Sequence, residues 1–138
     1  MIRTLLVSGL LIAGGACTSP TDAGGPPPVV LLGTWNYVST QASSSAKDSG
    51  TLTVTSQSGH NLQGTFAVDH LDSSGTHPVS GPVSGQALDS TTLNFDMFLN
   101  GTTDRQHLGT VKGDSITGTW VEMGVASGNF RAARKVGP

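Results

Sequence analysis

The sequence predicts an all-β protein, an eight-stranded antiparallel up-and-down meander that closes into a barrel. From Leu31 onward, apolar and polar residues alternate with a period of two, as they do in strands that bury one face. Turn residues interrupt this alternation about every ten to thirteen residues, which is typical of short strands joined by tight turns. Closure would remove the exposed sheet edges. A two-sheet sandwich is the alternative that the same alternation permits.

Composition favours the same fold class and excludes some partners. Only 12% of the 138 residues are charged, and the chain has a single Glu and three Lys, so good helix formers are scarce. The formal net charge is −2. Arg131, Arg134 and Lys135 are the nearest approach to a basic cluster, which makes nucleic acid and anionic lipid surfaces unsuitable partners.

The first residues indicate export. Met1–Thr4 carries a positive charge, Leu5–Ala13 is apolar but too short to span a bilayer, and Gly14–Cys17 follows. Small residues ending at a Cys resemble the bacterial lipoprotein cleavage site, which implies a signal peptide over residues 1–16 and a lipid on Cys17. Because Cys17 is the only cysteine, it cannot form an internal disulfide. The alternative is ordinary cleavage after Ala16 and free secretion.

A tether is expected between the lipid and the folded domain. Residues 17–28 are rich in Pro, Gly, Ser and Thr and show no apolar periodicity, so they are predicted to be flexible and partly extended. The barrel domain is expected to occupy residues 29–138. This arrangement predicts a lipid-anchored protein of the cell envelope, in the outer membrane if the organism has one.

The first four strands follow from alternation in the N-terminal half. Residues 31–38, 51–55, 62–69 and 79–85 each alternate apolar or glycine positions with polar ones. The fourth strand contains Pro82, which indicates a bend or an edge. Loops are expected over residues 41–50 and 72–77.

The last four strands are bounded by clearer turns. Residues 93–100 have the strongest alternation in the chain, and Asn100-Gly101 after them is a strong hairpin signal. Residues 107–112 come next, and Gly113-Asp114 is the turn that ends them. Residues 116–120 and 130–134 complete the set. Glycine recurs at inward positions of several strands, where it either permits strong bending or leaves space for a ligand: Gly33, Gly64, Gly81, Gly85 and Gly118.

Short motifs resemble known small barrels. Gly33-Thr34-Trp35, which opens the first strand, resembles the Gly-x-Trp start of lipocalins and avidins, and Gly118-Thr119-Trp120 repeats the triplet. The lipocalin resemblance implies that Trp35 packs across a closed barrel end against Arg131 or Arg134. Leu62–Phe66 resembles an avidin strand pattern. A third similar family is the bacterial periplasmic inhibitors of secreted metalloproteases, which also begin with a Gly-x-Trp strand.

No catalytic or metal site is predicted, and the protein is not expected to be an enzyme or to need a cofactor. His70 and His77, with Asp69 and Asp72, form the densest group, but their alternation points them apart. All four His, including His60 and His107, are therefore interpreted as solvated. No Gly-x-Ser-x-Gly motif joins a strand to a helix.

The aromatic residues suggest where a ligand would bind. They could line a pocket or simply fill the interior, and the candidates are Trp35, Tyr37, Phe66, Phe95 and Trp120. The first hypothesis is non-catalytic binding of a small, largely apolar molecule at the barrel mouth. The second is a protein-interaction barrel, either an exported protease inhibitor or a structural envelope component. An open apolar cavity of several hundred Å³ would favour the first. A filled interior with an exposed apolar patch or protruding loop would favour the second.

Overall fold

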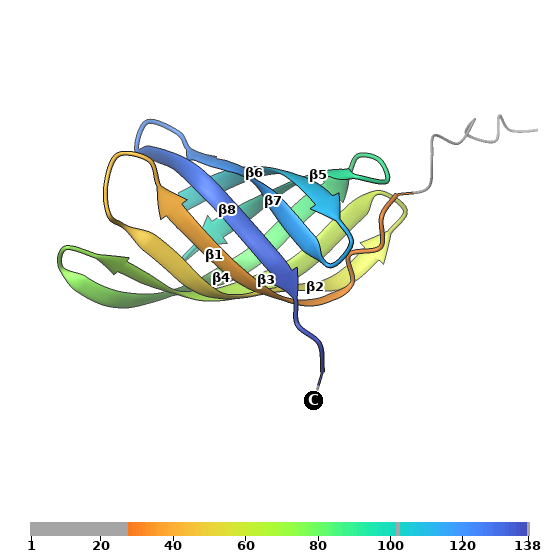
Figure 1. Ribbon diagram of the computed structural model, residues 1–138, viewed down its shortest axis with the longest axis horizontal. Coiled ribbons are helices and arrows are strands. Elements are labelled where there is room, and N and C mark those ends of the chain that lie inside the picture. The colour runs from red at the N-terminus through yellow and green to blue at the C-terminus, as the bar shows by residue number, and fades with distance from the viewer. Residues whose placement is uncertain (1–27, 102, 138) are drawn as a thin grey trace, which may run out of the picture.

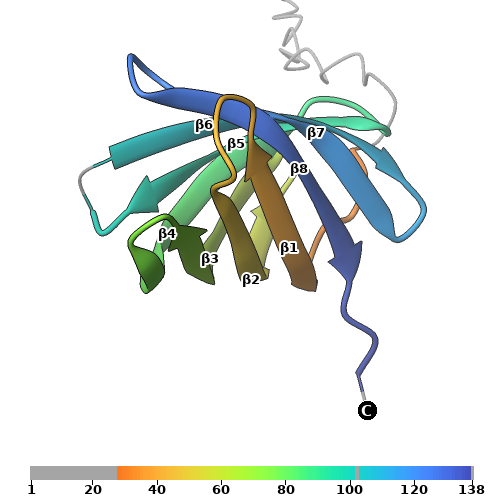
Figure 2. The ribbon, with the colours of Figure 1, turned by 60° about the vertical axis from the view of Figure 1, so that its left-hand side comes forward.

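The computed structural model describes residues 28–101 and 103–137, and within them the chain forms one closed eight-stranded barrel. Every strand pairs antiparallel with its neighbours in sequence, and β8 pairs with β1 to close the ring. The closing pair lies side by side in both views (Figures 1 and 2). The predicted up-and-down barrel is therefore confirmed. The strands are β1 (Gly33–Gln41), β2 (Lys47–Ser58), β3 (Asn61–Asp72), β4 (Gly75–Ala87), β5 (Thr92–Leu99), β6 (Thr103–Lys112), β7 (Ser115–Glu122) and β8 (Ala126–Arg134).

The two long predicted loops are shorter than expected. β2 already begins at Lys47, and β3 and β4 remain paired as far as Asp72 and Gly75, which leaves only residues 73 and 74 as a turn. The loop predictions for 47–50 and for much of 72–77 were wrong. The backbone groups of these mainly polar residues still pair with the neighbouring strand, so the ladder extends beyond the apolar alternation. As a result, the β3–β4 hairpin projects well beyond the β1–β2 hairpin (Figure 1).

The hairpin between β5 and β6 forms where the sequence predicts it. Asn100 and Gly101 have φ values of 49° and 77°, in the left-handed region that Asn and Gly adopt most readily in hairpin connections. The amide of Gly101 donates to the carbonyl of Phe98, which fastens the turn.

The interior of the barrel is filled with side chains. Phe95 and Trp120 both point inward and are buried, as the alternation requires. The largest fully buried side chains are Trp35, Tyr37, Leu31, Met97 and Ile116. A cavity among Leu52, Leu93 and their neighbours measures about 10 Å³, close to the space one water molecule needs. Among the described residues, no helix is long and apolar enough to cross a membrane.

Candidate functional site

One end of the barrel is closed by an arginine lying over a tryptophan. The guanidinium of Arg134 lies 4.3 Å from the centroid of the Trp35 ring. Arg134 also donates to the carbonyls of Leu32 (2.7 Å) and Val30 (3.1 Å), and the indole Nε1 of Trp35 donates to the carbonyl of Leu31 (3.0 Å). These bonds draw residues 30–32 across the opening. We call this arrangement, together with Asp114, the closed end.

The lipocalin resemblance offered two arginines for this contact. Arg134 is at the end of β8 and pairs in register with Trp35, so its side chain can lie over the ring. Arg131 occupies an outward position of β8 and is exposed. Asp114 accepts a hydrogen bond of 3.0 Å from Arg134 Nε, which orients the guanidinium.

An aromatic cluster fills the middle of the barrel. The rings of Phe95 and His107 stack with centroids 4.3 Å apart, and Phe130 meets the His107 ring edge-to-face at 5.0 Å. The hydroxyl of Tyr37 is 2.9 Å from His107 Nε2. His107 Nδ1 is 3.0 Å from the backbone carbonyl of Arg105, which can only accept, so Nδ1 carries the proton and Tyr37 donates to Nε2.

Burial fixes the charge state of this pair. It lowers the pKa of His107 to about 3 and raises the pKa of Tyr37 well above its ordinary value. Both side chains are therefore neutral at neutral pH. The pair acts as a fixed hydrogen bond in the core, because neither group exchanges its proton near pH 7.

The opposite end holds a network of polar and charged side chains, most of them buried, which we call the rim network: Ser39, Asp48, His70, Arg105 and Glu122. Asp48 Oδ2 accepts from the Ser39 hydroxyl and from Arg105 Nη1, both at 2.6 Å. Asp48 Oδ1 lies 2.6 Å from His70 Nδ1. Arg105 Nη2 donates to Glu122 Oε2 at 3.2 Å. Arg105 is therefore held between two carboxylates.

The pKa of Asp48 reflects this surrounding. Burial alone raises it, but the hydrogen bonds from Ser39 and His70 and the charge and hydrogen bond of Arg105 outweigh burial, so the net pKa lies below the ordinary value. Asp48 is thus ionised and saturated with donors. It neutralises Arg105 in the interior.

Trp120 lies beneath the rim network. The guanidinium of Arg105 is 4.2 Å from the centroid of its ring. Within the described part of the chain, the buried Nε1 of Trp120 has no hydrogen-bond partner. It lies against Gly128, where an added Cβ would be 2.8 Å away. The adjoining pit, lined by Asp48 and Gln41 among others, measures about 10 Å³, about enough for one water molecule.

Sequence reasoning missed these buried polar residues. The prediction that the histidines are solvated is wrong for His107, which is 2% exposed, and for His70, which is half-buried with Nδ1 2.6 Å from the buried carboxylate of Asp48. Arg105, His107, Gly109 and Val111 share the inward face of β6 at intervals of two, so the signal was present in the alternation. Among the described residues, no three His, Cys, Asp or Glu side chains are arranged to hold a metal ion.

The five aromatic candidates all point into the barrel. Each is buried, and they pack with the rest of the core. That they bind a ligand stays a prediction. The residues concerned are Trp35, Tyr37, Phe66, Phe95 and Trp120. Cys17, the predicted lipid attachment site, lies outside the described residues.

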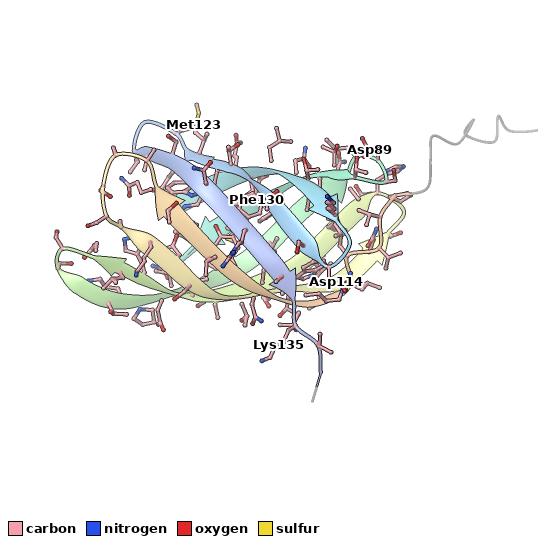
Figure 3. All side chains as sticks on the ribbon, viewed as in Figure 1. Asp89, Asp114, Met123, Phe130 and Lys135 are labelled. Atoms are coloured by element: carbon pink, nitrogen blue, oxygen red, sulfur yellow. The ribbon has the colours of Figure 1, made fainter. Side chains whose placement is uncertain are left out.

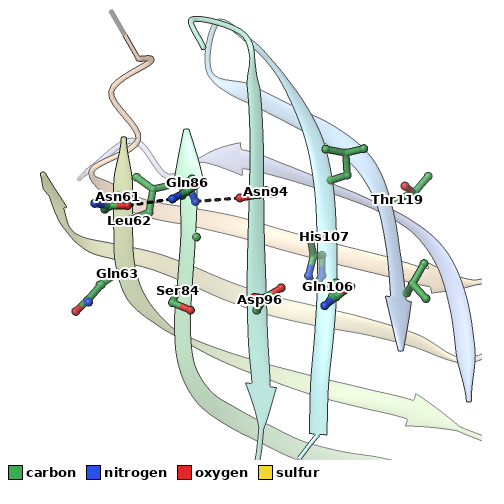
Figure 4. A pocket seen from close by; sticks show the side chains of 13 residues that line it. Asn61, Leu62, Gln63, Ser84, Gln86, Asn94, Asp96, Gln106, His107 and Thr119 are labelled. Carbon is green, nitrogen blue, oxygen red and sulfur yellow. Dashed lines mark hydrogen bonds between the residues drawn. The ribbon is translucent and has the colours of Figure 1, made fainter. Parts of the chain in front are cut away.

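A wide concave surface lies on the outside of the barrel. It has a volume of about 830 Å³ and spans β3 to β7, and we call it the outer-wall groove (Figure 4). Ten outward-facing side chains line it: Asn61, Gln63, Ser84, Gln86, Asn94, Asp96, Gln106, Leu108, Thr119 and Val121.

Strand register sorts these ten residues into two rows. Each row has one residue on each of five neighbouring strands, because every residue is the register partner of the next. The first row begins with the hydrogen-bonded amides Asn61, Gln86 and Asn94, which Figure 4 shows side by side. In full, the first row is Asn61, Gln86, Asn94, Leu108 and Thr119, and the second is Gln63, Ser84, Asp96, Gln106 and Val121.

A glycine lets the floor of the groove form. Gly85 faces inward on β4, and a Cβ there would lie 2.3 Å from the carbonyl oxygen of Asn94 and 2.6 Å from Cβ of Phe95. Only glycine permits this close approach of β4 to β5.

Asp96 lies in the groove, and burial and the neighbouring charge of Asp104 raise its pKa.

An exposed apolar turn lies next to the groove. Met123 and Val125, between β7 and β8, are 79% and 72% exposed, and Met123 points away from the barrel (Figure 3). Val121 and Leu108 continue this apolar surface into the groove.

Comparisons with known proteins confirm the fold. No family model matches the chain, and no curated protein matches it. A de novo designed fluorescence-activating β-barrel is similar with a TM-score of 0.61 and 18% identity, over 76% of this chain and 94% of that one. The redesigned β-barrel mFAP1, bound to DFHBI, has a TM-score of 0.64 and 17% identity over the same shares. EF1p2_mFAP2b, also bound to DFHBI, has a TM-score of 0.61 and 16% identity. At this identity the likeness concerns the barrel fold alone.

Proposed function

We propose that the protein is a non-catalytic binding barrel that recognises a small ligand on its outer-wall groove. The volume of the outer-wall groove carries this proposal. The cavities inside the barrel and at its rim each measure about 10 Å³, whereas the outer-wall groove measures about 830 Å³. Sites for small molecules are concave surfaces of several hundred Å³. A ligand in the interior would have to displace the packed aromatic cluster.

The similar structures support small-molecule binding as a use of this fold. Two of them are bound to DFHBI. The first hypothesis from the sequence, an apolar ligand at the barrel mouth, would need space that the rim network fills in this chain. Asp48, Arg105 and Trp120 occupy that position here. The outer wall therefore offers the larger site.

The state of the buried polar groups supports a role without catalysis. A general acid or base works best with a pKa near the working pH. The pKa values of Tyr37 and His107 are shifted away from neutrality by burial, and Asp48 is saturated by its donors. These groups stabilise the fold.

Nuclear magnetic resonance screening with neutral polar and apolar fragments tests the outer-wall proposal. We expect amide shifts at Asn94, Gln106 and their neighbours, and we expect Asn94→Trp to abolish them by filling the groove. Asn36→Trp is the matched control, because Asn36 is exposed on the outer face of β1 and does not line the outer-wall groove. Shifts centred on Leu93 and Ile116, which line the interior cavity, would overturn the proposal.

The filled interior together with the exposed turn favours the second hypothesis from the sequence, a protein-interaction barrel. Large apolar side chains as exposed as Met123 and Val125 often mark contact surfaces. A protein partner bound through this turn should be lost when both residues are changed to Ser and kept when the groove is filled by Asn94→Trp. Equal binding by both variants would argue against the turn.

We also propose export with lipid attachment at Cys17. The apolar segment Leu5–Ala13 followed by Gly14–Cys17 supports it. Mass spectrometry of the mature N-terminal peptide should show a peptide that begins at an acylated Cys17, and Cys17→Ala should abolish the modification. A mature peptide that begins at an unmodified Cys17 would instead indicate a freely secreted protein.

A further inference from the structure

We propose that the outer-wall groove binds a neutral, hydroxyl-rich ligand, namely a saccharide. This inference rests on the proposed function and specifies the ligand of that same site. It follows from the charge of the groove, from its hydrogen-bonding groups, from their spacing and from the apolar side chains at one edge.

Charge excludes anionic ligands from the groove. None of its lining residues is Lys or Arg, and one, Asp96, is acidic. Asp96 already lies in the field of Asp104, so a phosphate, sulfate or carboxylate there would meet repulsion without a compensating cation. The ligand that fits this surface is neutral.

The hydrogen-bonding groups match hydroxyls. Five of the ten outward side chains are carboxamides, each of which carries two N–H donors beside an acceptor oxygen. A hydroxyl group both donates and accepts, so two adjacent sugar hydroxyls can pair with one carboxamide. The oxygens of Asn61 and Asn94 each accept one bond from Gln86, at 3.2 Å. Within the described residues, the side-chain amides of Gln63 and Gln106 make no hydrogen bond, so they remain available to a ligand.

The spacing of these groups suits a chain of sugar rings. Adjacent strands lie about 4.8 Å apart, so each row presents one side chain at about this interval, close to the length of a pyranose ring. The first row places amides on three successive strands at Asn61, Gln86 and Asn94. A short oligosaccharide laid across the strands would meet one polar side chain per ring.

The edge of the groove on β6 and β7 carries two apolar side chains beside Gln106 and Thr119. Leu108 and Val121 there are exposed and adjoin the polar rows. Sugar rings present C–H groups on their faces, and these would cover the two aliphatic side chains. No aromatic ring among the outward-facing lining residues offers a stacking platform, so we expect weak binding, with a Kd of about 1 mM.

An extended peptide fits the groove less well. Within the groove each of β4, β5 and β6 is paired on both sides, so the groove offers no free strand edge to the peptide backbone. The apolar side chains of such a peptide would also lie against the polar carboxamides, Ser84 and Asp96 that line the groove. A peptide is therefore an outcome that the experiment must distinguish.

Amide shift titrations with defined probes test the inference. The probes are neutral tetrasaccharides of glucose and of N-acetylglucosamine, a neutral unstructured peptide of similar length, and inorganic phosphate. We expect at least one tetrasaccharide to shift groove amides on β4 to β6, and phosphate and the peptide to have no effect there.

Variants of the groove link the shifts to its side chains. Gln106→Ala and Gln63→Ala remove carboxamides that make no bond within the described chain, so the fold should be unaffected. Each should weaken binding about fivefold, the effect of one lost hydrogen bond. Asn36→Ala, an exposed carboxamide on β1, is the matched control and should leave the Kd unchanged.

The outcomes separate the two proposals. Groove shifts with the peptide but with neither tetrasaccharide would overturn the saccharide inference and leave outer-wall binding intact. The same holds if neutral fragments bind in the groove and no tetrasaccharide does. Tetrasaccharide shifts centred on the interior residues would overturn both. Equal Kd values for Gln106→Ala, Gln63→Ala and wild type would also overturn the inference.

Discussion

The two ends of the barrel use the same contact in different surroundings. At each end an arginine lies over the tryptophan of a Gly-Thr-Trp triplet, Arg134 over Trp35 at 4.3 Å and Arg105 over Trp120 at 4.2 Å. The side chain of Arg134 is 31% exposed, and that of Arg105 is 7% exposed. The repeated Gly-Thr-Trp motif therefore takes part in one arginine contact that is partly exposed to solvent and in one that is buried.

The partners of the two arginines differ accordingly. Arg134 is held mainly by backbone carbonyls, which carry no net charge. Arg105 is held by the carboxylates of Asp48 and Glu122, in a place where charges are costly to leave without partners. The closed end therefore depends on shape and hydrogen bonding, whereas the rim network depends on charge balance.

Removing Asp48 should have the largest effect on stability. Asp48→Ala leaves Arg105 and Ser39 buried with fewer partners, so the free energy of unfolding should fall by about 3–5 kcal/mol. Urea denaturation measures this. Asp69→Ala, at an exposed outward position of the neighbouring strand, is the control and should change it by about 0.5 kcal/mol or less. Similar losses for both variants would contradict a charge-balanced rim.

Acid should destabilise the barrel through His107, which is buried in the interior next to the rim network. The folded pKa of His107 is about 3, below the unfolded value of about 6.5, so between these values the unfolded chain binds a proton that the folded chain does not. Stability is therefore lost as the pH falls through this window. Between pH 6.5 and pH 4 the loss should be about 3 kcal/mol at 1.36 kcal/mol per unit.

The lowered pKa of Asp48 adds a further loss at lower pH, because its stabilisation disappears as the carboxylate becomes protonated. Urea denaturation at a series of pH values measures the slope. His107→Gln should flatten it between pH 6.5 and pH 4, and an unchanged slope in that variant would show that another group titrates.

Some of this architecture could be predicted from the sequence. Trp35, Phe95 and Trp120 follow the period of two, and their inward positions came directly from it. The pairing of Trp35 with an arginine of the last strand was expected from a resemblance, which left Arg131 and Arg134 as alternatives. Register decides between them, because Trp35 and Arg134 are directly paired.

The rim network and the groove could not be predicted in the same way. Asp48 and Arg105 are separated by 57 positions, and a polar residue at an inward position is readily interpreted as part of a loop until its partner is known. The rows of the groove depend on register across five strands. A shift of one residue in any of these strands would turn that strand's groove-lining side chains inward. The rows therefore exist only in the folded sheet.

Replacing each tryptophan by phenylalanine should distinguish the two ends by about 1–2 kcal/mol. Both changes remove similar volume, but Trp35→Phe also leaves the carbonyl of Leu31 without its donor. Trp120→Phe removes a buried N–H that has no partner in the described part of the chain, so this substitution should lower the free energy of unfolding by less. Thermal and urea unfolding should show Trp35→Phe to be the less stable variant. The reverse order would indicate that a water molecule accepts a hydrogen bond from Nε1 of Trp120.

Removing the exposed acid at the closed end should have the smallest effect. Asp114 is 77% exposed and accepts one hydrogen bond from Arg134, which keeps its bonds to the carbonyls of Leu32 and Val30 without it. Asp114→Ala should therefore lower the free energy of unfolding by about 0.5 kcal/mol or less, and added salt should reduce even this difference. Urea denaturation at low and high salt measures it. A loss comparable to that of Asp48→Ala would mean that the closed end also depends on charge balance, and the contrast between the two arginines would then lie only in their exposure.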